Sequence, residues 1–274
     1  MAIQHQAARG SENFPVASKL IPPAARAQVL AFYDFARGAD NIADDPRLSA
    51  AARHDALMVL KEAIDNHQIN RLPPWARDYT QRVERGQIPR RYGEELLHAF
   101  MQDTQKTRYG DIDELLDYCA FSAVPVGRMM LRMCDEQEAN KPAADALCTM
   151  LQLLNHVQDI KSDYETLDRI YLPQNWLEQA RVDETELAAT QCSAGLRIVI
   201  DQLLDVCDEQ WLNAAPLMRT IRSHRLRLEL AVIHAAARRL SDKLRTQDPL
   251  AGRVGLSKMD KALCLLRAWK KAAG

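Results

Sequence analysis

Apolar residues recur at helical spacing along almost the whole chain, and this pattern constrains the fold more than any other feature of the sequence. Val29, Phe32, Tyr33 and Ala36 stand at positions i, i+3, i+4 and i+7 and predict a helix that must end at Pro46. No run of alternating β-branched residues is long enough to predict a strand. The sequence therefore predicts an all-α helical bundle, in which sites are built from inward-facing side chains. A further apolar stripe contains Leu196, Val199, Ile200, Leu203, Leu204, Cys207 and Trp211.

Two other helical segments have recognisable boundaries or interruptions. Asp111 is followed three residues later by Glu114, which is a capping-box pattern at the start of an apolar segment. Pro125 lies inside that segment. Because proline lacks a backbone N–H, we expect the helix to be kinked or broken near residues 121–127. Another helix is predicted over residues 142–165.

Length and charge limit the organisation and the partners of the chain. With 274 residues and no long linker or internal repeat, the economical prediction is one all-α domain over residues 1–274. The chain has 36 basic and 37 acidic residues, and this net charge of −1 offers no electrostatic footprint for binding duplex nucleic acid. We therefore expect no nucleic-acid partner.

Hydropathy and cysteine content indicate the compartment. No stretch approaches the roughly 18 uninterrupted apolar residues of a membrane span. The N-terminus lacks the apolar block of a secretory signal, so we expect a cytoplasmic protein. The cysteines include no C-x-x-C pair and are predicted to be free, buried thiols. They are Cys119, Cys134, Cys148, Cys192, Cys207 and Cys264.

Four polar residues form one stripe on the first predicted helix. Tyr33, Arg37, Asp40 and Asp44 stand at offsets 0, 4, 7 and 11, so at about 100° per residue they fall within roughly 60° of one another. Two carboxylates one turn apart are oxygen ligands of the kind that Mg²⁺ prefers. Arg37 and Tyr33 can donate hydrogen bonds to a phosphate oxygen. The same aspartate spacing occurs on many solvated helix faces, so this stripe alone is a weak signal.

A second stripe of the same kind strengthens the metal hypothesis. Gln152, Asn155, Asp159 and Asp163 stand at offsets 0, 3, 7 and 11 on the helix predicted over residues 142–165. Four aligned polar residues in an otherwise apolar helix are costly to bury without partners. Two such stripes on separate helices can face each other across a cavity, where cations between them offset the repulsion of four carboxylates.

Three motifs combine these stripes with neighbouring segments. They are Tyr33-x-x-x-Arg37-x-x-Asp40-x-x-x-Asp44, the segment Tyr118–Gly127, and Asn155-x-x-x-Asp159-x-x-x-Asp163 with Arg169-Ile170-Tyr171-Leu172-Pro173. With these motifs the sequence resembles the squalene and phytoene synthase family of isoprenoid synthases over nearly its whole length. The resemblance implies a single all-α domain, a helical bundle with a central cavity, in which two aspartate-rich helices bind Mg²⁺ and diphosphate.

A finer resemblance rests on three further features. The segments Ser11–Ser18 and Ser122–Arg128, together with Gln158, are similar to the hydroxysqualene synthase branch of bacterial hopanoid biosynthesis. Related squalene and phytoene synthases more often have arginine where Gln158 stands. This branch implies a substrate, presqualene diphosphate, that loses diphosphate to leave a cyclopropylcarbinyl cation, which rearranges and is captured by water to give hydroxysqualene.

That reaction has physical requirements that residues of the sequence can meet. Mg²⁺ and Arg37 would supply positive charge to the leaving diphosphate. Pro125 would free a carbonyl near residue 121, whose dipole could face the carbocation. The carbocation also needs a dry apolar wall. Candidates for this wall are Phe121, Val124, Val126 and Leu151.

The positions that match the family motifs imply roles for individual residues. The implied catalytic residues are Asp40, Asp44, Asp159, Asp163 and Tyr118. The implied Mg²⁺ ligands are Asp40, Asp44, Asn155, Asp159 and Asp163. The implied substrate-binding residues are Ser11, Asn13, Tyr33, Arg37, Phe121, Gln152, Asn155, Arg169 and Tyr171.

One position departs from the family pattern, and two other functions stay open. Asn41 stands where an aspartate commonly follows Asp40, but on a helix it points about 100° away, so the pair Asp40 and Asp44 is intact. The first alternative is a head-to-head prenyl transferase that makes presqualene diphosphate, squalene or phytoene, against which Gln158 and the segment Ser122–Gly127 argue. The second is a non-catalytic helical assembly factor, against which the retained aspartates argue.

The resemblance also indicates which partners to expect. We expect a prenyl diphosphate substrate and leave open a presqualene diphosphate synthase as a protein partner. The histidines show no H-E-x-x-H or similar pairing, so we expect none of them to bind metal. A peripheral contact with anionic lipid is also left open. The arginines considered for it, most of which we expect to be solvated, are Arg219, Arg222, Arg225, Arg227, Arg238 and Arg239.

Overall fold

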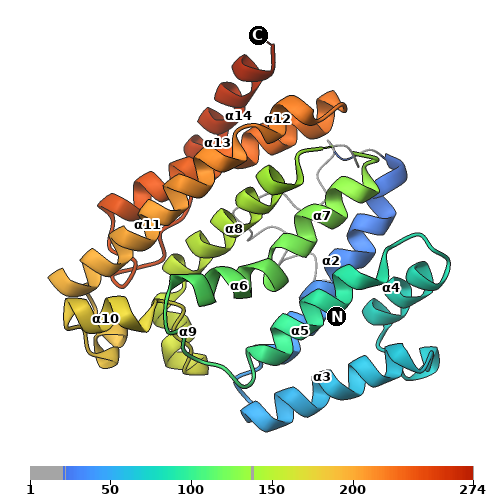
Figure 1. The fold of residues 1–274 in the computed structure, drawn as a ribbon, viewed down its shortest axis with the longest axis horizontal. Coiled ribbons are helices and arrows are strands. Elements are labelled where there is room, and N and C mark those ends of the chain that lie inside the picture. The colour runs from blue at the N-terminus through green and yellow to red at the C-terminus, as the bar shows by residue number, and fades with distance from the viewer. Residues whose placement is uncertain (1–20, 22, 137–138, 274) are drawn as a thin grey trace. The chain divides into compact units, whose positions relative to one another are not determined.

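The computed structural model of the protein describes residues 21, 23–136 and 139–273, and its helices are shown in Figure 1. Every regular element within those ranges is a helix, which confirms the all-α prediction. An isolated bridge there joins Arg108 and Ile170. The α-helices and the 3-10 helices (η) are α2 (Pro23–Ala43), α3 (Ala50–Asp65), η1 (Ile69–Arg71), α4 (Pro74–Glu84), α5 (Arg90–Gln102), α6 (Ile112–Ser122), α7 (Val124–Met133), α8 (Lys141–Gln158), α9 (Ile160–Leu167), α10 (Gln174–Ala180), η2 (Glu184–Ala188), α11 (Ala194–Ala214), α12 (Leu217–Thr220), α13 (His224–Thr246) and α14 (Lys258–Ala273).

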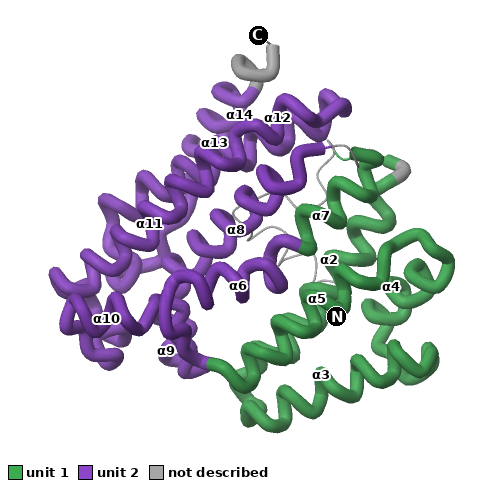
Figure 2. Tube along the Cα trace, viewed as in Figure 1, with its two compact units in different colours: residues 1–106, 125–137 green, residues 107–124, 138–274 purple. Residues whose placement is uncertain are grey.

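The chain divides into two compact units, which Figure 2 shows in different colours. Unit 1 comprises Met1–Lys106 and Pro125–Gln137, and unit 2 comprises Thr107–Val124 and Glu138–Gly274. Unit 1 therefore contains α2 to α5 and nearly all of α7, whereas unit 2 contains α6 and α8 to α14. A single domain over residues 1–274 stays a prediction.

The core of unit 1 forms around α2, which packs against α3, α4 and α5. Phe35 of α2 is fully buried and stacks on Tyr79 of α4, with ring centroids 4.0 Å apart. Gly38 lies on the same side of α2 and leaves room for Trp75, because a Cβ at this position would stand only 2.4 Å from the indole ring. One face of α2 is therefore occupied by aromatic packing, and the helix ends before Pro46 as predicted.

The core of unit 2 is built on α8 and α11, and α6 and α13 also pack against α8. Leu153 and Leu154 of α8 are completely shielded from solvent. On α11, the predicted apolar stripe is buried from Leu196 to Cys207, and Trp211 is half-buried. The helical period therefore located the buried face of α11 correctly.

The interruption expected around Pro125 is present. α6 and α7 are separated at Ala123, where the backbone leaves the helical region with φ −120° and ψ −44°. At the start of α6, the Asp111 carboxylate accepts a hydrogen bond from the Glu114 N–H at 2.9 Å, as the capping pattern predicts. The Glu114 carboxylate accepts from the Gly110 N–H, one residue before the capping position. The predicted helix start is therefore confirmed, with the reciprocal contact displaced by one residue.

The helix predicted over residues 142–165 differs from the structure at one position. α8 and α9 meet at Asp159, whose φ of −107° and ψ of 10° are not helical. The hydrogen-bond ladder continues across this residue, because the Asp159 N–H donates to the Asn155 carbonyl at 2.9 Å and the Asp163 N–H donates to the Asp159 carbonyl at 2.8 Å. The Ser162 hydroxyl donates to the same Asp159 carbonyl at 2.9 Å. The junction therefore changes the helix geometry but keeps the one-turn spacing of the polar stripe.

The cysteines form no disulfide, which confirms that they are free thiols. Four of the six are buried, whereas Cys148 and Cys192 are half-buried, so the expectation of burial holds for four of them. No helix in the described part of the chain has the length and apolar content that would be needed to cross a bilayer.

Candidate active site

The first polar stripe lies on α2, in unit 1. Tyr33, Arg37, Asp40 and Asp44 are all half-buried. Arg37 Nη1 donates to Asp40 Oδ2 at 2.9 Å, and the Asp44 N–H donates to the Asp40 carbonyl at 2.9 Å. The second bond sets the two carboxylates one helical turn apart. Asn41 is exposed. The structure therefore brings together the four predicted residues of this stripe on one helix.

Asp40 and Asp44 lie near the C-terminal end of α2, where the buried Arg53 guanidinium donates a hydrogen bond to the Ala43 carbonyl at 3.1 Å. The last turn of α2 contains no basic residue, and the helix end itself carries the negative end of the macrodipole. Acidic side chains are disfavoured there unless a cation offsets their charge. Just beyond the helix, Arg47 is already paired with Asp45 at 2.6 Å. A cation bound by both carboxylates of the stripe would be stabilised by the helix end as well.

The second polar stripe lies in unit 2 and crosses the junction of α8 and α9. Gln152, Asn155, Asp159 and Asp163 are half-buried, like the residues of the first stripe. Arg253, 94 residues further along the chain, donates from Nη1 to Asp159 Oδ1 at 2.8 Å. The Arg253 side chain is 64% exposed, so water screens the attraction between the two charges. Asp159 therefore already accepts a cationic group that an incoming metal ion could displace.

The segment that follows α9 positions Arg169 and Tyr171, and both side chains are buried. The Arg169 N–H donates to the Asp163 carbonyl at 3.1 Å, which ties the segment to the second stripe. The Ile170 N–H donates to the Thr107 carbonyl at 2.9 Å. Two predicted substrate-binding residues are thus held next to a predicted metal ligand by backbone hydrogen bonds.

Arg108 anchors the same segment through two ion pairs. Its guanidinium lies 2.8 Å from Glu184 and 2.7 Å from Asp168. Hydrogen bonds to Glu184, and then to Asp168, raise the pKa of Arg108 above its ordinary value. Asp168 takes the left-handed conformation, with φ 52°, that ends α9. Arg108 therefore stabilises the turn that leads from the second stripe to the segment of Arg169 and Tyr171.

Four buried aromatic rings pack together beside α8. His156 lies nearly parallel to Tyr171 with ring centroids 3.8 Å apart, and Tyr109 and Tyr118 each lie 5.6 Å from Tyr171. Burial, followed by the charge of Arg169, lowers the pKa of His156 to about 3. The imidazole is therefore neutral near pH 7, and its Nε2 has no hydrogen-bond partner in the structure. The predicted catalytic residue Tyr118 belongs to this cluster.

A small pocket joins the second stripe to this aromatic cluster. Asp163, Arg169 and Tyr171 are among the residues that line it. The pocket has room for about one water molecule, so it marks where these side chains meet and is not a space that a diphosphate could occupy in this structure. The other residues that line the pocket are His156, Ile160, Ile170, Leu172 and Leu187.

The four predicted wall residues do not share one environment. Phe121 and Val126 are 42% and 40% exposed, respectively, whereas Val124 is buried and Leu151 is half-buried. The buried aromatic surface beside α8 comes instead from His156 and the tyrosines. The structure therefore brings only part of the predicted apolar wall into a buried position.

The oxygen donors of both stripes are of the chemical type that binds Mg²⁺. Each stripe offers two carboxylates one turn apart, and the second stripe adds the amide oxygen of Asn155. Hard oxygen donors of this type suit Mg²⁺, which keeps several waters or substrate oxygens around it. No three His, Cys, Asp or Glu side chains converge on a common point in the described ranges. Ser11 and Asn13, also predicted to bind substrate, lie outside the described residues.

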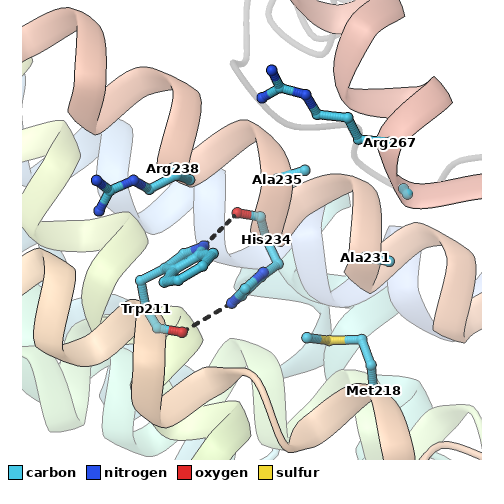
Figure 3. A pocket seen from close by; sticks show the side chains of 8 residues that line it. Trp211, Met218, Ala231, His234, Ala235, Arg238 and Arg267 are labelled. Carbon is cyan, nitrogen blue, oxygen red and sulfur yellow. Dashed lines mark hydrogen bonds between the residues drawn. The ribbon is translucent and has the colours of Figure 1, made fainter. Parts of the chain in front are cut away.

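A larger pocket in unit 2 is lined by different residues (Figure 3). Trp211 of α11 and His234 of α13 stack with ring centroids 4.6 Å apart. The Trp211 Nε1–H donates to the His234 carbonyl at 3.1 Å, and His234 Nε2 lies 2.9 Å from the Trp211 carbonyl. Arg238 lies over the Trp211 ring at 5.6 Å. The residues that line this pocket include none of the predicted site residues.

Sequence reasoning missed three residues that shape the surroundings of the second stripe. Arg253 and Arg108 pair with acids that lie 94 and 60 residues away, and no local spacing indicates such pairs. The stacking of His156 on Tyr171 depends on how the segment after α9 folds back against α8. The signal that the sequence did contain was Tyr171 itself, within the third motif.

Comparison with known proteins identifies the family. Residues 7–260 match the squalene/phytoene synthase family. The chain belongs to this family. It is 39% identical to the hydroxysqualene synthase of Rhodopseudomonas palustris, over 91% of this chain and 85% of that protein. It is 35% identical to the hydroxysqualene synthase of Sinorhizobium fredii, over 92% of this chain and 86% of that protein. The resemblance inferred from the motifs is confirmed.

Solved structures of the squalene/phytoene synthase family share this fold. The squalene synthase of Alicyclobacillus acidocaldarius superposes with a TM-score of 0.72 at 26% identity, covering 90% of this chain and 93% of that one. The all-α architecture described above is therefore that of the family.

Proposed function

We propose that this protein is a hydroxysqualene synthase, which converts presqualene diphosphate and water into hydroxysqualene and diphosphate. The observation that carries the proposal is the similarity, over nine-tenths of the chain, to two bacterial proteins of that name. The carboxylate pairs of the two stripes, each in contact with an arginine, support it. In this reaction the C–O bond to diphosphate breaks, the oxygen of water bonds to the rearranged carbocation, and one proton of that water is released.

The proposed cofactor is Mg²⁺. When bound, it would supply the positive charge that stabilises the diphosphate as it leaves. Asp40 and Asp159 each accept a hydrogen bond from a guanidinium, which supports a role for these carboxylates in holding positive charge. The proposed ligands are Asp40, Asp44, Asn155, Asp159 and Asp163.

We assign the diphosphate to donors on both stripes and on the segment after α9. Arg37 and Arg169 carry planar guanidinium groups that can donate two hydrogen bonds to phosphate oxygens. The burial of Arg169, whose backbone N–H donates to the Asp163 carbonyl, supports this role, because water screens its charge only weakly there. Tyr33 and Tyr171 would add phenol donors. For the other predicted substrate-binding residues the proposal rests on the family motifs alone. These residues are Ser11, Asn13, Phe121, Gln152 and Asn155.

Aromatic rings beside α8 are proposed to stabilise the carbocation and to keep water from it. Tyr118 and Tyr171 are buried, and the face of an aromatic ring attracts a cation through its quadrupole. The neutral state of His156, whose pKa burial and the charge of Arg169 lower to about 3, avoids a further positive charge in this cluster. These observations support the place of Tyr118 among the catalytic residues.

A second function is favoured by one observation, which is that the structural relative from Alicyclobacillus acidocaldarius is a squalene synthase. A head-to-head prenyl transferase would consume farnesyl diphosphate, whereas the proposed enzyme would consume presqualene diphosphate. The proposed substrate must come from a reaction that joins two farnesyl diphosphates. A complex with the enzyme of that reaction, like a cytoplasmic location, stays a prediction.

The deciding experiment supplies the purified protein with Mg²⁺ and with either presqualene diphosphate or farnesyl diphosphate, in water enriched in ¹⁸O. We expect only presqualene diphosphate to be consumed and the heavy oxygen to appear in hydroxysqualene, identified by mass spectrometry. Consumption of farnesyl diphosphate alone would replace the proposal with the prenyl transferase. If Asp40→Asn and Asp159→Asn variants support hopanoid production as well as the parent does, the assembly-factor function is the better one.

A further inference from the structure

The last helix, α14 (Figure 1), has one buried face and one exposed face of different character. Asp260, Cys264 and Ala268 follow one another at helical spacing and are buried, and α13 is the element against which α14 packs. The Asp260 carboxylate lies 2.7 Å from Arg239 and 3.2 Å from Lys243, both on α13. These ion pairs fix the rotation of α14 about its axis. The packing on α13 therefore determines which residues of α14 face outward.

That outward face is apolar. Met259, Leu263, Leu265 and Leu266 are 72%, 45%, 49% and 56% exposed, respectively. Ten large apolar residues are exposed in the described part of the chain, and these four fall within eight consecutive positions. Single exposed apolar residues are ordinary, but a contiguous cluster is typical of a binding surface. α14 therefore presents a surface that a partner of apolar character would cover.

The charges around the apolar face are basic. Lys258, Lys261 and Arg267 are exposed on the same helix, and the sequence adds Lys270 and Lys271. The single acidic residue of α14 is the buried one that pairs with α13. Because the whole chain has a net charge of only −1, this accumulation of basic residues is local. The partner should therefore carry negative charge next to its apolar part.

The beginning of α13 extends the basic region. α14 runs antiparallel to α13, because Asp260 near its start pairs with the second half of α13, whereas Ala268 near its end shares a pocket with Ala231. The end of α14 therefore approaches the start of α13, where Arg222 and Arg225 are exposed. The same pocket is the one in Figure 3, where the Arg267 side chain comes from α14.

We propose that α14 binds the surface of a bilayer that contains anionic phospholipid, with the apolar face, Met259 to Leu266, inserted below the headgroups. An apolar face bordered by lysine and arginine is the pattern of helices that lie in a membrane interface. The 16 residues of α14 span about 24 Å, less than the ~30 Å hydrocarbon core, so the helix would lie along the surface. The proposal does not depend on the reaction proposed above.

A second copy of the chain fits this surface less well. A two-fold contact through α14 would place the basic residues of one copy against those of the other. No exposed acidic residue of the helix would be available to pair with them, and like charges across an interface disfavour association. A bilayer with anionic lipid, in contrast, offers both negatively charged headgroups and an apolar hydrocarbon core.

The experiment measures sedimentation of the full chain with vesicles of phosphatidylcholine alone and with vesicles that also contain phosphatidylglycerol. We expect the parent to bind the anionic vesicles and to be released as salt is raised, since screening weakens the charge attraction. A Leu263→Ser/Leu266→Ser variant should bind at least about tenfold more weakly. A Lys258→Gln/Lys261→Gln/Arg267→Gln variant should lose the preference for anionic vesicles.

A matched control replaces apolar residues of similar exposure elsewhere. Val59 on α3 and Ile198 on α11 are 65% and 56% exposed, and a Val59→Ser/Ile198→Ser variant should bind vesicles like the parent. Circular dichroism and thermal unfolding establish that each variant is folded. Failure of the parent to bind anionic vesicles, or equal binding by the leucine variant, overturns the proposal. A parent that is a dimer without lipid and that the leucine variant converts to a monomer overturns it in favour of a second copy.

Discussion

The side-chain amide of Gln158 donates a hydrogen bond to the Val254 carbonyl. The adjacent residues, Asp159 and Arg253, form an ion pair at 2.8 Å, so two consecutive residues of one segment contact two consecutive residues of the other. Gln158 is buried, and its hydrogen bond is therefore shielded from water. This double contact holds the segment before α14 against the end of α8, next to the proposed Mg²⁺ ligands.

The buried hydrogen bond of Gln158 should contribute to stability. We expect Gln158→Leu to lower the free energy of unfolding by about 1–2 kcal/mol, because the buried Val254 carbonyl loses its donor. Urea denaturation at neutral pH measures this change. Gln179→Leu, at an exposed position of α10, serves as the control and should change stability by less than about 0.5 kcal/mol. Equal stability of the two variants would contradict the prediction.

The ion pair of Arg253 should compete with Mg²⁺ for Asp159. In Arg253→Gln the guanidinium is absent, so we expect the Mg²⁺ concentration for half-maximal activity to fall severalfold. A titration of activity with Mg²⁺ measures the effect. Arg47→Gln is the control, because Arg47 pairs with Asp45, which is not a proposed ligand. An unchanged Mg²⁺ requirement in Arg253→Gln would show that the guanidinium and the metal ion do not share Asp159.

The carboxylates of both stripes should be required for turnover. We expect Asp44→Asn and Asp163→Asn each to lower kcat/KM by at least about 100-fold, because each removes charge that holds the metal ion. Both side chains are half-buried, so unfolding free energies should stay within about 1 kcal/mol of the parent. Asn41→Asp adds charge at an exposed position off the stripe, and its kcat/KM should stay within a few-fold. A larger change in kcat/KM in Asn41→Asp would show that position 41 contributes to catalysis.

The interruption between α6 and α7 should affect turnover. In Pro125→Ala the restored N–H can bond the carbonyl of residue 121, which favours one continuous helix over the break at Ala123. We expect a severalfold lower kcat with no loss of stability, measured by product formation and thermal unfolding. Pro142→Ala, at the start of α8 where the backbone N–H is not needed, should behave like the parent. Full turnover by Pro125→Ala would argue against a catalytic role for that carbonyl.

The contacts of Asp260 should make stability depend on pH. Hydrogen bonds from Ser257, and then from Arg239, hold the pKa of Asp260 well below its usual range. The unfolded carboxyl takes up a proton near its ordinary pKa of about 3.8, whereas the folded carboxyl stays charged. The stability from this group is therefore present above about pH 4 and is lost as the pH falls further.

A substitution isolates that pH dependence. Asp260→Asn should be less stable than the parent at pH 7 by about 2 kcal/mol, because two cationic partners lose the negative charge and one of the two acceptor oxygens that they contact. It should then lose less stability on acidification, as measured by urea denaturation at about pH 7 and pH 3. Asp78→Asn is the control, since the Asp78 side chain is 54% exposed and its pair with Arg82 is screened. If the free energy of unfolding changed with pH in the same way in the parent and in Asp260→Asn, the pH dependence would not come from Asp260.

The helical period was sufficient to predict the all-α fold, the buried face of α11 and the end of α2. It was sufficient because the hydrogen bonds of a helix join residues four positions apart, so its signals are local in the sequence. The one-turn spacing of Asp40 and Asp44, and of Asp159 and Asp163, is present in the structure for the same reason. Likewise the loss of one N–H at Pro125 predicted the break at Ala123.

Only the tertiary structure decided which distant residues meet. Arg253 reaches Asp159, and Tyr171 stacks on His156, because loops return these segments to α8, and no local period encodes that return. The burial of Arg169 and the apolar face that α14 leaves exposed were decided in the same way. Residue type and spacing set what each helix can present, whereas packing against other helices determines which of those side chains lose water and which keep it.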